Sequence, residues 1–201
     1  MSHSDDSGTE RFHATSGRVS GWMTVVTAAA TAVVGVLYVD DGFPAWVIAA
    51  ALLVGVLAWA AMLRPALWVH EEHLVMRNML ETIHIRLVAV EELAVRQVLA
   101  VRAADRRWVS TAIGRSLRKT MASGRRAPAG ADGKPATSVK YVDFVEDRIR
   151  LLVDDARKSA GIRPGSPDQL ALPDAVRRER AWVPIALIAV SAVALVVSLL
   201  V

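Results

Sequence analysis

Two histidines and two glutamates in one short segment are the residues best suited by type to metal chemistry. His70, Glu71, Glu72 and His73 could supply nitrogen and oxygen ligands to a metal ion. Zinc protease helices place their two histidines four residues apart, with the glutamate next to the first. Here the histidines are three residues apart and flank an expected turn. We therefore expect a solvated hairpin and no metal site.

The remaining candidate nucleophiles and bases lack the neighbours that would activate them. His84 alternates with apolar Ile83 and Ile85, which predicts a surface histidine. Ser110 and Thr111 have no His and Asp arrangement near them in the sequence. The chain also contains no cysteine, which removes cysteine nucleophiles, thiolate zinc sites and iron–sulfur clusters. We expect no catalytic residue, no cofactor and no enzymatic activity.

Positive charge is concentrated between Arg102 and Lys140, where ten basic residues stand against Asp105 and Asp132. Near the cytoplasmic surface of a membrane, each basic residue attracts anionic lipid by about 1 kcal/mol. We hypothesise that this segment contacts anionic head groups or a partner; the alternative is that it serves solubility and membrane orientation. The candidate binding residues are Arg106, Arg107, Arg115, Arg118, Lys119, Arg125 and Arg126. Trp108 is the one aromatic residue interleaved with them that could stack on a base, so we expect no nucleic-acid partner.

Three runs of the chain contain no charged residue at all. They are Val19 to Val39, Gly42 to Leu63 and Ala181 to Val201, although 22% of the whole chain is charged. A helix that crosses the hydrocarbon core of a bilayer needs about 20 apolar residues. The runs therefore predict three transmembrane helices, the first two forming a hairpin. Because no charge lies inside them, we do not expect an ion or transport pathway.

Aromatic and basic residues near the ends of these runs predict how they sit in the membrane. Amphipathic rings favour the interface, and basic residues are retained on the cytoplasmic side. The loop at Asp40 and Asp41 has no basic residue, which places it outside and leaves the N-terminus and the central segment in the cytoplasm. Small residues at four-residue spacing, Ala28 with Ala32, also predict close helix packing. The expected interface anchors are Trp22, Trp46, Trp59, Arg64, Arg177, Arg178, Arg180 and Trp182.

The central segment predicts a small α+β domain. Alternating apolar residues from Ala66 to about Ile113 indicate about five antiparallel strands, with Leu93 to Val101 as one of them. The step of three between Leu87, Val90 and Leu93 indicates one helical turn or a bulge. An amphipathic helix follows from Val139 to about Arg157, with its apolar stripe on Val142, Val145, Ile149 and Leu152 or Val153.

These elements divide the chain into five parts. We expect a disordered cytoplasmic tail over residues 1–18, a transmembrane hairpin over 19–63, a cytoplasmic domain over 64–158 and a linker over 159–180. The third transmembrane helix covers residues 181–201. Within the domain, the Gly- and Pro-containing basic stretch 114–138 is expected to be a mobile loop.

The segment from Leu67 to Arg102 resembles the bacterial pleckstrin-homology-like (PH-like) domain found in small membrane-anchored proteins. The likeness lies mainly in LWVHEEHLVMRNMLETIHIRLVAVEELAVR and extends to the helix from Val139 to about Arg157. The resemblance implies a small antiparallel sheet or partial barrel with a C-terminal helix. It also implies a multi-pass protein of the bacterial inner, or plasma, membrane.

The resemblance implies a non-enzymatic protein that presents its PH-like domain as an interaction or assembly platform. An exposed sheet edge or the groove beside the C-terminal helix would then bind an unidentified membrane protein partner. Two alternatives remain open: an anionic-lipid sensor that uses the basic loop, and an accessory subunit of a membrane enzyme or transporter.

Overall fold

The computed structural model describes residues 9–12, 17–96, 98–113 and 135–200, with side chains from residue 141 onward in the last range. The chain divides into two compact units, each considered by itself. The sheet unit comprises the described parts of Met1–Ser16, Ala66–Arg77 and Thr82–Glu179. The helical unit comprises Gly17–Pro65, Asn78–Glu81 and the described part of Arg180–Val201.

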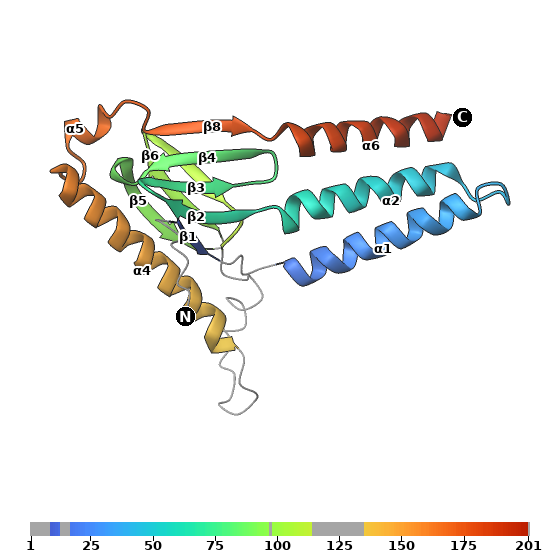
Figure 1. Ribbon diagram of the computed structural model, residues 1–201, viewed down its shortest axis with the longest axis horizontal. Helices are drawn as coiled ribbons and strands as arrows, with labels where there is room; N and C mark the ends of the chain where they lie inside the picture. Colours follow the sequence, from blue (N-terminus) through green and yellow to red (C-terminus); the bar gives the residue numbers. More distant parts are fainter. Residues whose placement is uncertain (1–8, 13–16, 97, 114–134, 201) are drawn as a thin grey trace, which may run out of the picture. The chain divides into compact units, whose positions relative to one another are not determined.

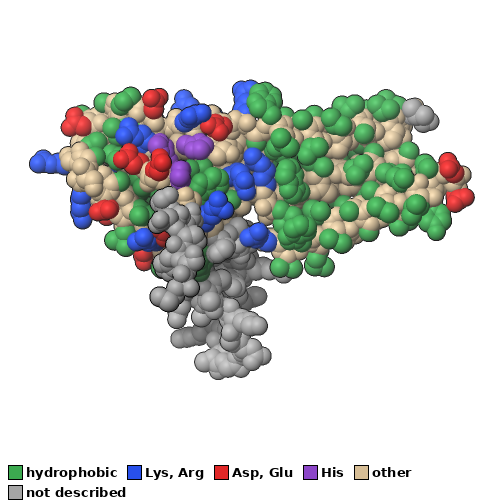
Figure 2. All heavy atoms as spheres, in the orientation of Figure 1, with side chains coloured by type: hydrophobic (Ala, Val, Ile, Leu, Met, Phe, Trp, Pro, Cys, Tyr) green, Lys and Arg blue, Asp and Glu red, His purple; other side chains and the backbone are tan. Residues whose placement is uncertain are grey.

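Three apolar helices make up most of the helical unit: α1 (Arg18–Leu37), α2 (Ala45–Ala58) and α6 (Trp182–Leu200). A π-helical turn, η1 (Trp59–Leu63), extends α2. The helix α2 lies between α1 and α6 (Figure 1), and hydrophobic side chains are spread along the visible surface of the three (Figure 2). By length and composition α1, α6 and the continuous helix of α2 and η1 could each cross a membrane. The expectation of three long apolar helices is confirmed.

Small residues let α1 and α2 approach closely. Gly21, Ala28 and Gly35, at seven-residue spacing on α1, are buried. A Cβ added to Gly35 would lie 2.5 Å from Ile48 Cγ1, and one added to Gly55 would lie 3.2 Å from Ala28 Cβ. Bulkier side chains at these positions would push the helices apart. The expected close packing at Ala28 and Ala32 is therefore confirmed, although the tightest contacts recur every seven residues.

Hydroxyl groups within the helices bond to the backbone of their own helix. Thr24 Oγ1 donates to the carbonyl of Ser20, Thr31 Oγ1 to that of Thr27, and Ser191 Oγ to that of Leu187. Such bonds satisfy a polar side chain where water is excluded. These hydroxyls are therefore compatible with an apolar surrounding.

The sheet unit contains two antiparallel sheets and one long helix. One sheet has the order β1-β2-β3-β4-β8, and the other has the order β5-β6-β7. The 3₁₀ turn η2 (Leu87–Ala89) joins the two sheets, where the sequence predicts a helical turn or bulge. The strands are β1 (Thr9–Phe12), β2 (Ala66–His70), β3 (His73–Arg77), β4 (Glu81–Arg86), β5 (Val90–Val95), β6 (Leu99–Ala103), β7 (Arg106–Ser110) and β8 (Val176–Arg180). The helices are α4 (Pro135–Ala160) and the short α5 (Pro167–Leu170).

The core of the sheet unit lies between the two sheets and α4, which packs along β5 and η2 (Figure 1). Alternation decides which strand residues enter it, as at Leu74 and Met76, or at Ile83 and Ile85. The helix contributes the residues that its apolar stripe predicts, namely Val142, Val145, Ile149 and Val153, all buried. The predicted orientation of this helix is confirmed.

The N-terminal residues 9–12 are not part of a disordered tail. They form β1, which pairs antiparallel with β2, and Phe12 is 6% exposed in the core. Glu10 binds the Arg148 guanidinium of α4, with Nε to carboxylate distances of 3.0 and 3.1 Å. This hydrogen bond, and then the charge of Glu10, raise the pKa of Arg148 above its ordinary value, against the small effect of burial. A four-residue strand with one buried side chain leaves almost no periodic signal in the sequence.

Three other expectations need correction. The stretch from Leu93 to Val101 is two strands, β5 and β6, joined by a hairpin. The expected linker 159–180 contains α5 and the sheet strand β8. The helix α4 begins at Pro135, inside the expected loop 114–138. The described residues thus hold eight strands, where the sequence indicates about five.

Candidate functional site

Trp22, Trp46 and Trp182, expected as interface anchors, are exposed on the helical unit, and Trp59 is half-buried. Trp22 lies in the second turn of α1, Trp182 begins α6, and Trp59 begins η1. Gly21 lies beside Met62 and Leu63 of η1, so α1 begins where α2 and its extension end. Trp22 and Trp59 therefore belong to the same end of the α1–α2 pair, whereas Trp46 lies near the loop at its other end.

Arg64, another expected anchor, follows η1 directly and is half-buried. Its guanidinium donates to the carbonyl oxygens of Asn78 and Met79, the latter at 2.9 Å. These two residues belong to the β3–β4 turn (Asn78–Glu81). Arg64 thus holds a sheet turn at the end of the helix, a role that sequence patterns do not reveal.

Arg177, Arg178 and Arg180 lie on β8 and not in a linker. Arg177 pairs with Glu179 at 2.9 Å, and the guanidinium of Arg178 stands over the ring of Trp108 on β7, 5.6 Å from its centre. Arg178 therefore ties β8 of the larger sheet to β7 of the smaller one. Arg180 is exposed two residues before α6 begins.

A groove of about 680 Å³ lies along β5, β6 and β7. Ala94 and Ala100, opposite each other in register, lie along its floor. It is lined by Glu92, Ala94, Arg96, Val98, Ala100, Val101, Arg102, Asp105 and Arg107. The groove combines small apolar residues with charges of both signs, which suits a polar ligand or a peptide better than a purely apolar one.

Two arginines that line this groove are neighbours on adjacent strands. Arg102 and Arg107 are direct partners in the β6–β7 register, and like charges so placed repel. Arg102 is compensated by Glu91 at 3.0 Å and by Asp105 at 3.7 Å. Arg107 is exposed and makes no ion pair with the part of the chain that the structure describes.

Of the seven candidate lipid-binding or partner-binding residues, the structure describes two. Arg106 and Arg107 begin β7 and are both exposed. The other five lie outside the described residues: Arg115, Arg118, Lys119, Arg125 and Arg126. The structure therefore places Arg107 at the groove. That the other five residues bind lipid stays a prediction.

The histidine and glutamate segment forms the β2–β3 hairpin. His70 and His73 pair across it, and Glu71 and Glu72 form the turn, as the sequence predicts. His84 lies half-buried on β4, with Nε2 3.8 Å from a carboxylate oxygen of Glu179 on β8. Over residues 9–12, 17–96, 98–113 and 135–200, no three metal-ligating side chains gather in a metal-site arrangement.

The outward side of α4 carries large apolar residues that are not among the candidate residues predicted from the sequence. Phe144 is 58% exposed and Leu151, two turns further on, is 62% exposed. The half-buried Tyr141 lies beside Phe144, with 6.5 Å between the ring centres. The signal was available, because the two positions interrupt the otherwise polar side of the helix. We call Tyr141, Phe144 and Leu151 the α4 apolar patch.

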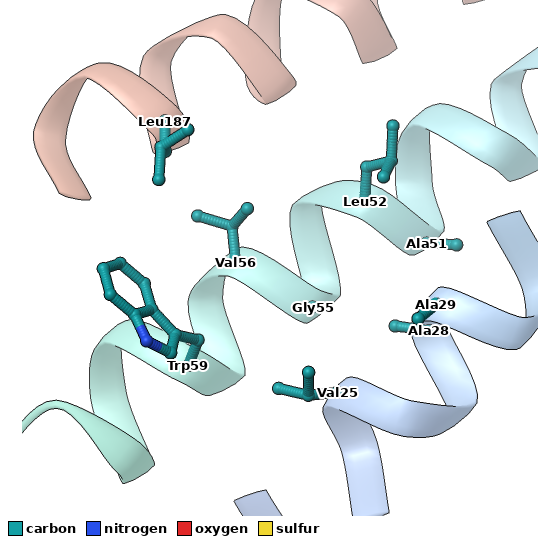
Figure 3. Close-up of a pocket in the computed structure, with 9 residues that line it drawn as sticks. All are labelled: Val25, Ala28, Ala29, Ala51, Leu52, Gly55, Val56, Trp59 and Leu187. Carbon is teal, nitrogen blue, oxygen red and sulfur yellow. The ribbon is translucent and has the colours of Figure 1, made fainter. Parts of the chain in front are cut away.

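An apolar crevice of about 280 Å³ opens between the three helices of the helical unit. Figure 3 shows Ala28 and Ala29 of α1 facing α2, with Trp59 and Leu187 toward one end. Its lining is Val25, Ala28, Ala29, Ala51, Leu52, Gly55, Val56, Trp59 and Leu187. Among the side chains that line the crevice, only the indole of Trp59 can donate a hydrogen bond. The crevice therefore suits an apolar occupant.

Comparison with known proteins returned no matching family model, no matching curated protein and no matching solved structure.

Proposed function

We propose that this chain is an integral membrane protein whose three helices span the bilayer and hold a PH-like domain on the cytoplasmic side. The domain acts as a non-enzymatic interaction platform in a bacterial plasma membrane. Three long apolar helices support the membrane part of the proposal. The charge distribution supports the orientation, because the α1–α2 loop carries Asp40 and Asp41 and no basic residue.

The element order supports the PH-like part. A larger antiparallel sheet is followed by the three-stranded sheet β5-β6-β7 and then by α4, which packs on the core between them. The resemblance implies this succession of sheet and C-terminal helix. The strand β8 departs from it, because it follows α4 and returns to the larger sheet beside β4.

The observation that carries the platform function is the short connection at each end of the domain. Only Arg64 and Pro65 separate η1 from β2, and only Ala181 separates β8 from α6. The last part of the expected linker 159–180 is the strand β8. Through these connections the proposed spans keep the domain at the membrane, where neighbouring membrane proteins can reach it.

The α4 apolar patch is the contact surface that we propose for the partner. An amphipathic helix normally keeps its outward side polar, and Val145 and Ile149 already occupy the core side of α4. Phe144 and Leu151 are therefore not needed for the fold. Exposed aromatic and aliphatic residues are the side chains that anchor protein interfaces.

Site-specific photocrosslinking in intact membranes tests this proposal. We expect a photoreactive amino acid at Phe144 or Leu151 to give a discrete protein adduct, and one at Asp168, exposed on α5, to give none. An adduct of the same mass at all three positions, or none at any, would contradict the platform function. If the adduct contains a membrane enzyme or transporter, the protein is its accessory subunit.

Anionic-lipid sensing is the second candidate function, and the two exposed arginines at the start of β7, Arg106 and Arg107, favour it. In nanodiscs that contain a photoactivatable anionic phospholipid, we expect lipid labelling that falls in Arg106→Gln/Arg107→Gln. The matched control is Arg163→Gln, at another exposed arginine. Equal labelling of the wild type and both variants would exclude a role for these two residues.

A further inference from the structure

The turn between β3 and β4 belongs to the helical unit, although the rest of both strands belongs to the sheet unit. It is closed by a hydrogen bond from the Asn78 amide to the Glu81 carbonyl, at 2.8 Å. Further bonds hold it from outside, among them one from Arg64 to the Asn78 carbonyl. Arg64 donates to the Met79 carbonyl at 2.9 Å, and the Ala181 amide donates to the Leu80 carbonyl at 2.9 Å.

These bonds fix the depth of the turn relative to the three helices. Arg64 follows the last residue of η1, and Ala181 precedes Trp182, the first residue of α6. The backbone of Leu80 is therefore one hydrogen bond away from the start of a helix that is long and apolar enough to cross a membrane. Trp182 is exposed at that same helix end, and such a ring favours the boundary between head groups and hydrocarbon.

The tip of the turn is apolar. Leu80 is 43% exposed and Met79 is half-buried, whereas turn positions commonly carry Gly, Asn, Asp, Ser or Pro. An exposed leucine at this depth would meet lipid and not bulk water. Its burial among acyl chains would favour the same position of the turn that the hydrogen bonds impose.

We propose that the Met79–Leu80 tip inserts into the lipid interface and anchors the β3–β4 hairpin to the bilayer beside α2 and α6. The inference rests on the proposed membrane-spanning role of the three helices. In addition to the three spans, the protein would contact lipid through a turn in the middle of the chain. This contact requires no specific head group. The occupant is the boundary between head groups and acyl chains of the bilayer.

Fluorophore depth measurements on the full-length protein in nanodiscs test the proposal. Because the chain has no cysteine, single-cysteine variants can be labelled with an environment-sensitive dye. Leu80→Cys tests the tip, Val54→Cys on an exposed part of α2 tests the span, and Glu72→Cys tests the other end of β3. Quenching by spin-labelled lipid is measured at each position, and Met79→Cys replaces Leu80→Cys if the latter does not fold.

We expect the dye at Leu80 to emit at a shorter wavelength than at Glu72 and to be quenched most by lipids labelled near the head group. The dye at Val54 should be quenched most by lipids labelled deep in the acyl chain. If Val54 is quenched and Leu80 behaves like Glu72, the anchor is wrong and the spans stand. If lipid quenches neither Val54 nor Leu80, the proposed membrane placement fails and the anchor with it.

Discussion

Gln169 shows how a single buried polar side chain stabilises the junction between the two sheets. It is 2% exposed, and its Nε2 donates to the carbonyls of Val88 at 2.8 Å and Val90 at 3.1 Å. Its Oε1 accepts from the Gly165 amide at 2.7 Å. Arg157, also buried, donates to the Val90 and Glu91 carbonyls. The bend at η2 and the start of β5 therefore depend on side chains from α4 and α5.

Replacing Gln169 should be costly for this reason. Gln169→Leu keeps similar bulk but leaves backbone groups near Val88 and Gly165 without a buried partner, and each such group costs about 1–3 kcal/mol. We expect a lower thermal unfolding midpoint for the detergent-solubilised full-length protein. Asp168→Asn, at the exposed neighbouring position, should change the free energy of unfolding by less than about 0.5 kcal/mol. Equal midpoints for Gln169→Leu and the wild type would show that these bonds contribute no net stability.

For single residues, the residue type predicted the place of some side chains but not the partners of others. The exposed tryptophans Trp22 and Trp182 could be predicted, because an interfacial ring next to an apolar run has a local signature. The partners of Arg64 and Arg178 could not, because Met79 and Trp108 are brought to them only by folding. An arginine near a membrane helix indicates a charge at the interface but not the group that it binds.

Among the elements, the apolar helices and the amphipathic α4 were predictable because each repeats one pattern over several turns. The β5–β6 hairpin was not, because Leu93, Val95, Leu99 and Val101 are all separated by even numbers of residues. The alternation therefore continues through the turn as though the strand did not end. Strands β1 and β8 have little alternation at all, and long-range pairing decides their place, with β1 on β2 and β8 beside β4.

The strand β1 gives a direct test of this long-range pairing. Phe12→Ala removes a side chain that packs in the core, and we expect it to lower the free energy of unfolding by about 3 kcal/mol. Arg11→Ala, at the exposed neighbouring position on the same strand, should be nearly neutral. Denaturant titration of the full-length protein in detergent compares the two. Were the N-terminal residues a disordered tail, both variants would unfold like the wild type.

For the molecule as a whole, the two-unit division follows from two different sequence signals. Lipid-compatible helices arise from runs without charge, whereas the sheet unit arises from alternation plus one amphipathic helix. The chain leaves the helical unit after Pro65 and returns to it after Glu179, and it also returns at the turn Asn78–Glu81. This last return has no sequence signature, because hydrogen bonds from Arg64 and the Ala181 backbone create it.

The charges at the two ends of the helices predict the orientation of the whole molecule. Arg18, Arg64 and Arg180 flank the beginning of α1, the end of η1 and the beginning of α6, while the α1–α2 loop carries Asp40 and Asp41. Since basic residues are retained in the cytoplasm, the loop should face outward. In intact cells, we expect Asp41→Cys to react with a membrane-impermeant maleimide, and Lys158→Cys on the exposed end of α4 to react only after permeabilisation. The reverse pattern would place the sheet unit outside, and neither a cytoplasmic platform nor attraction to the anionic inner leaflet could then be maintained.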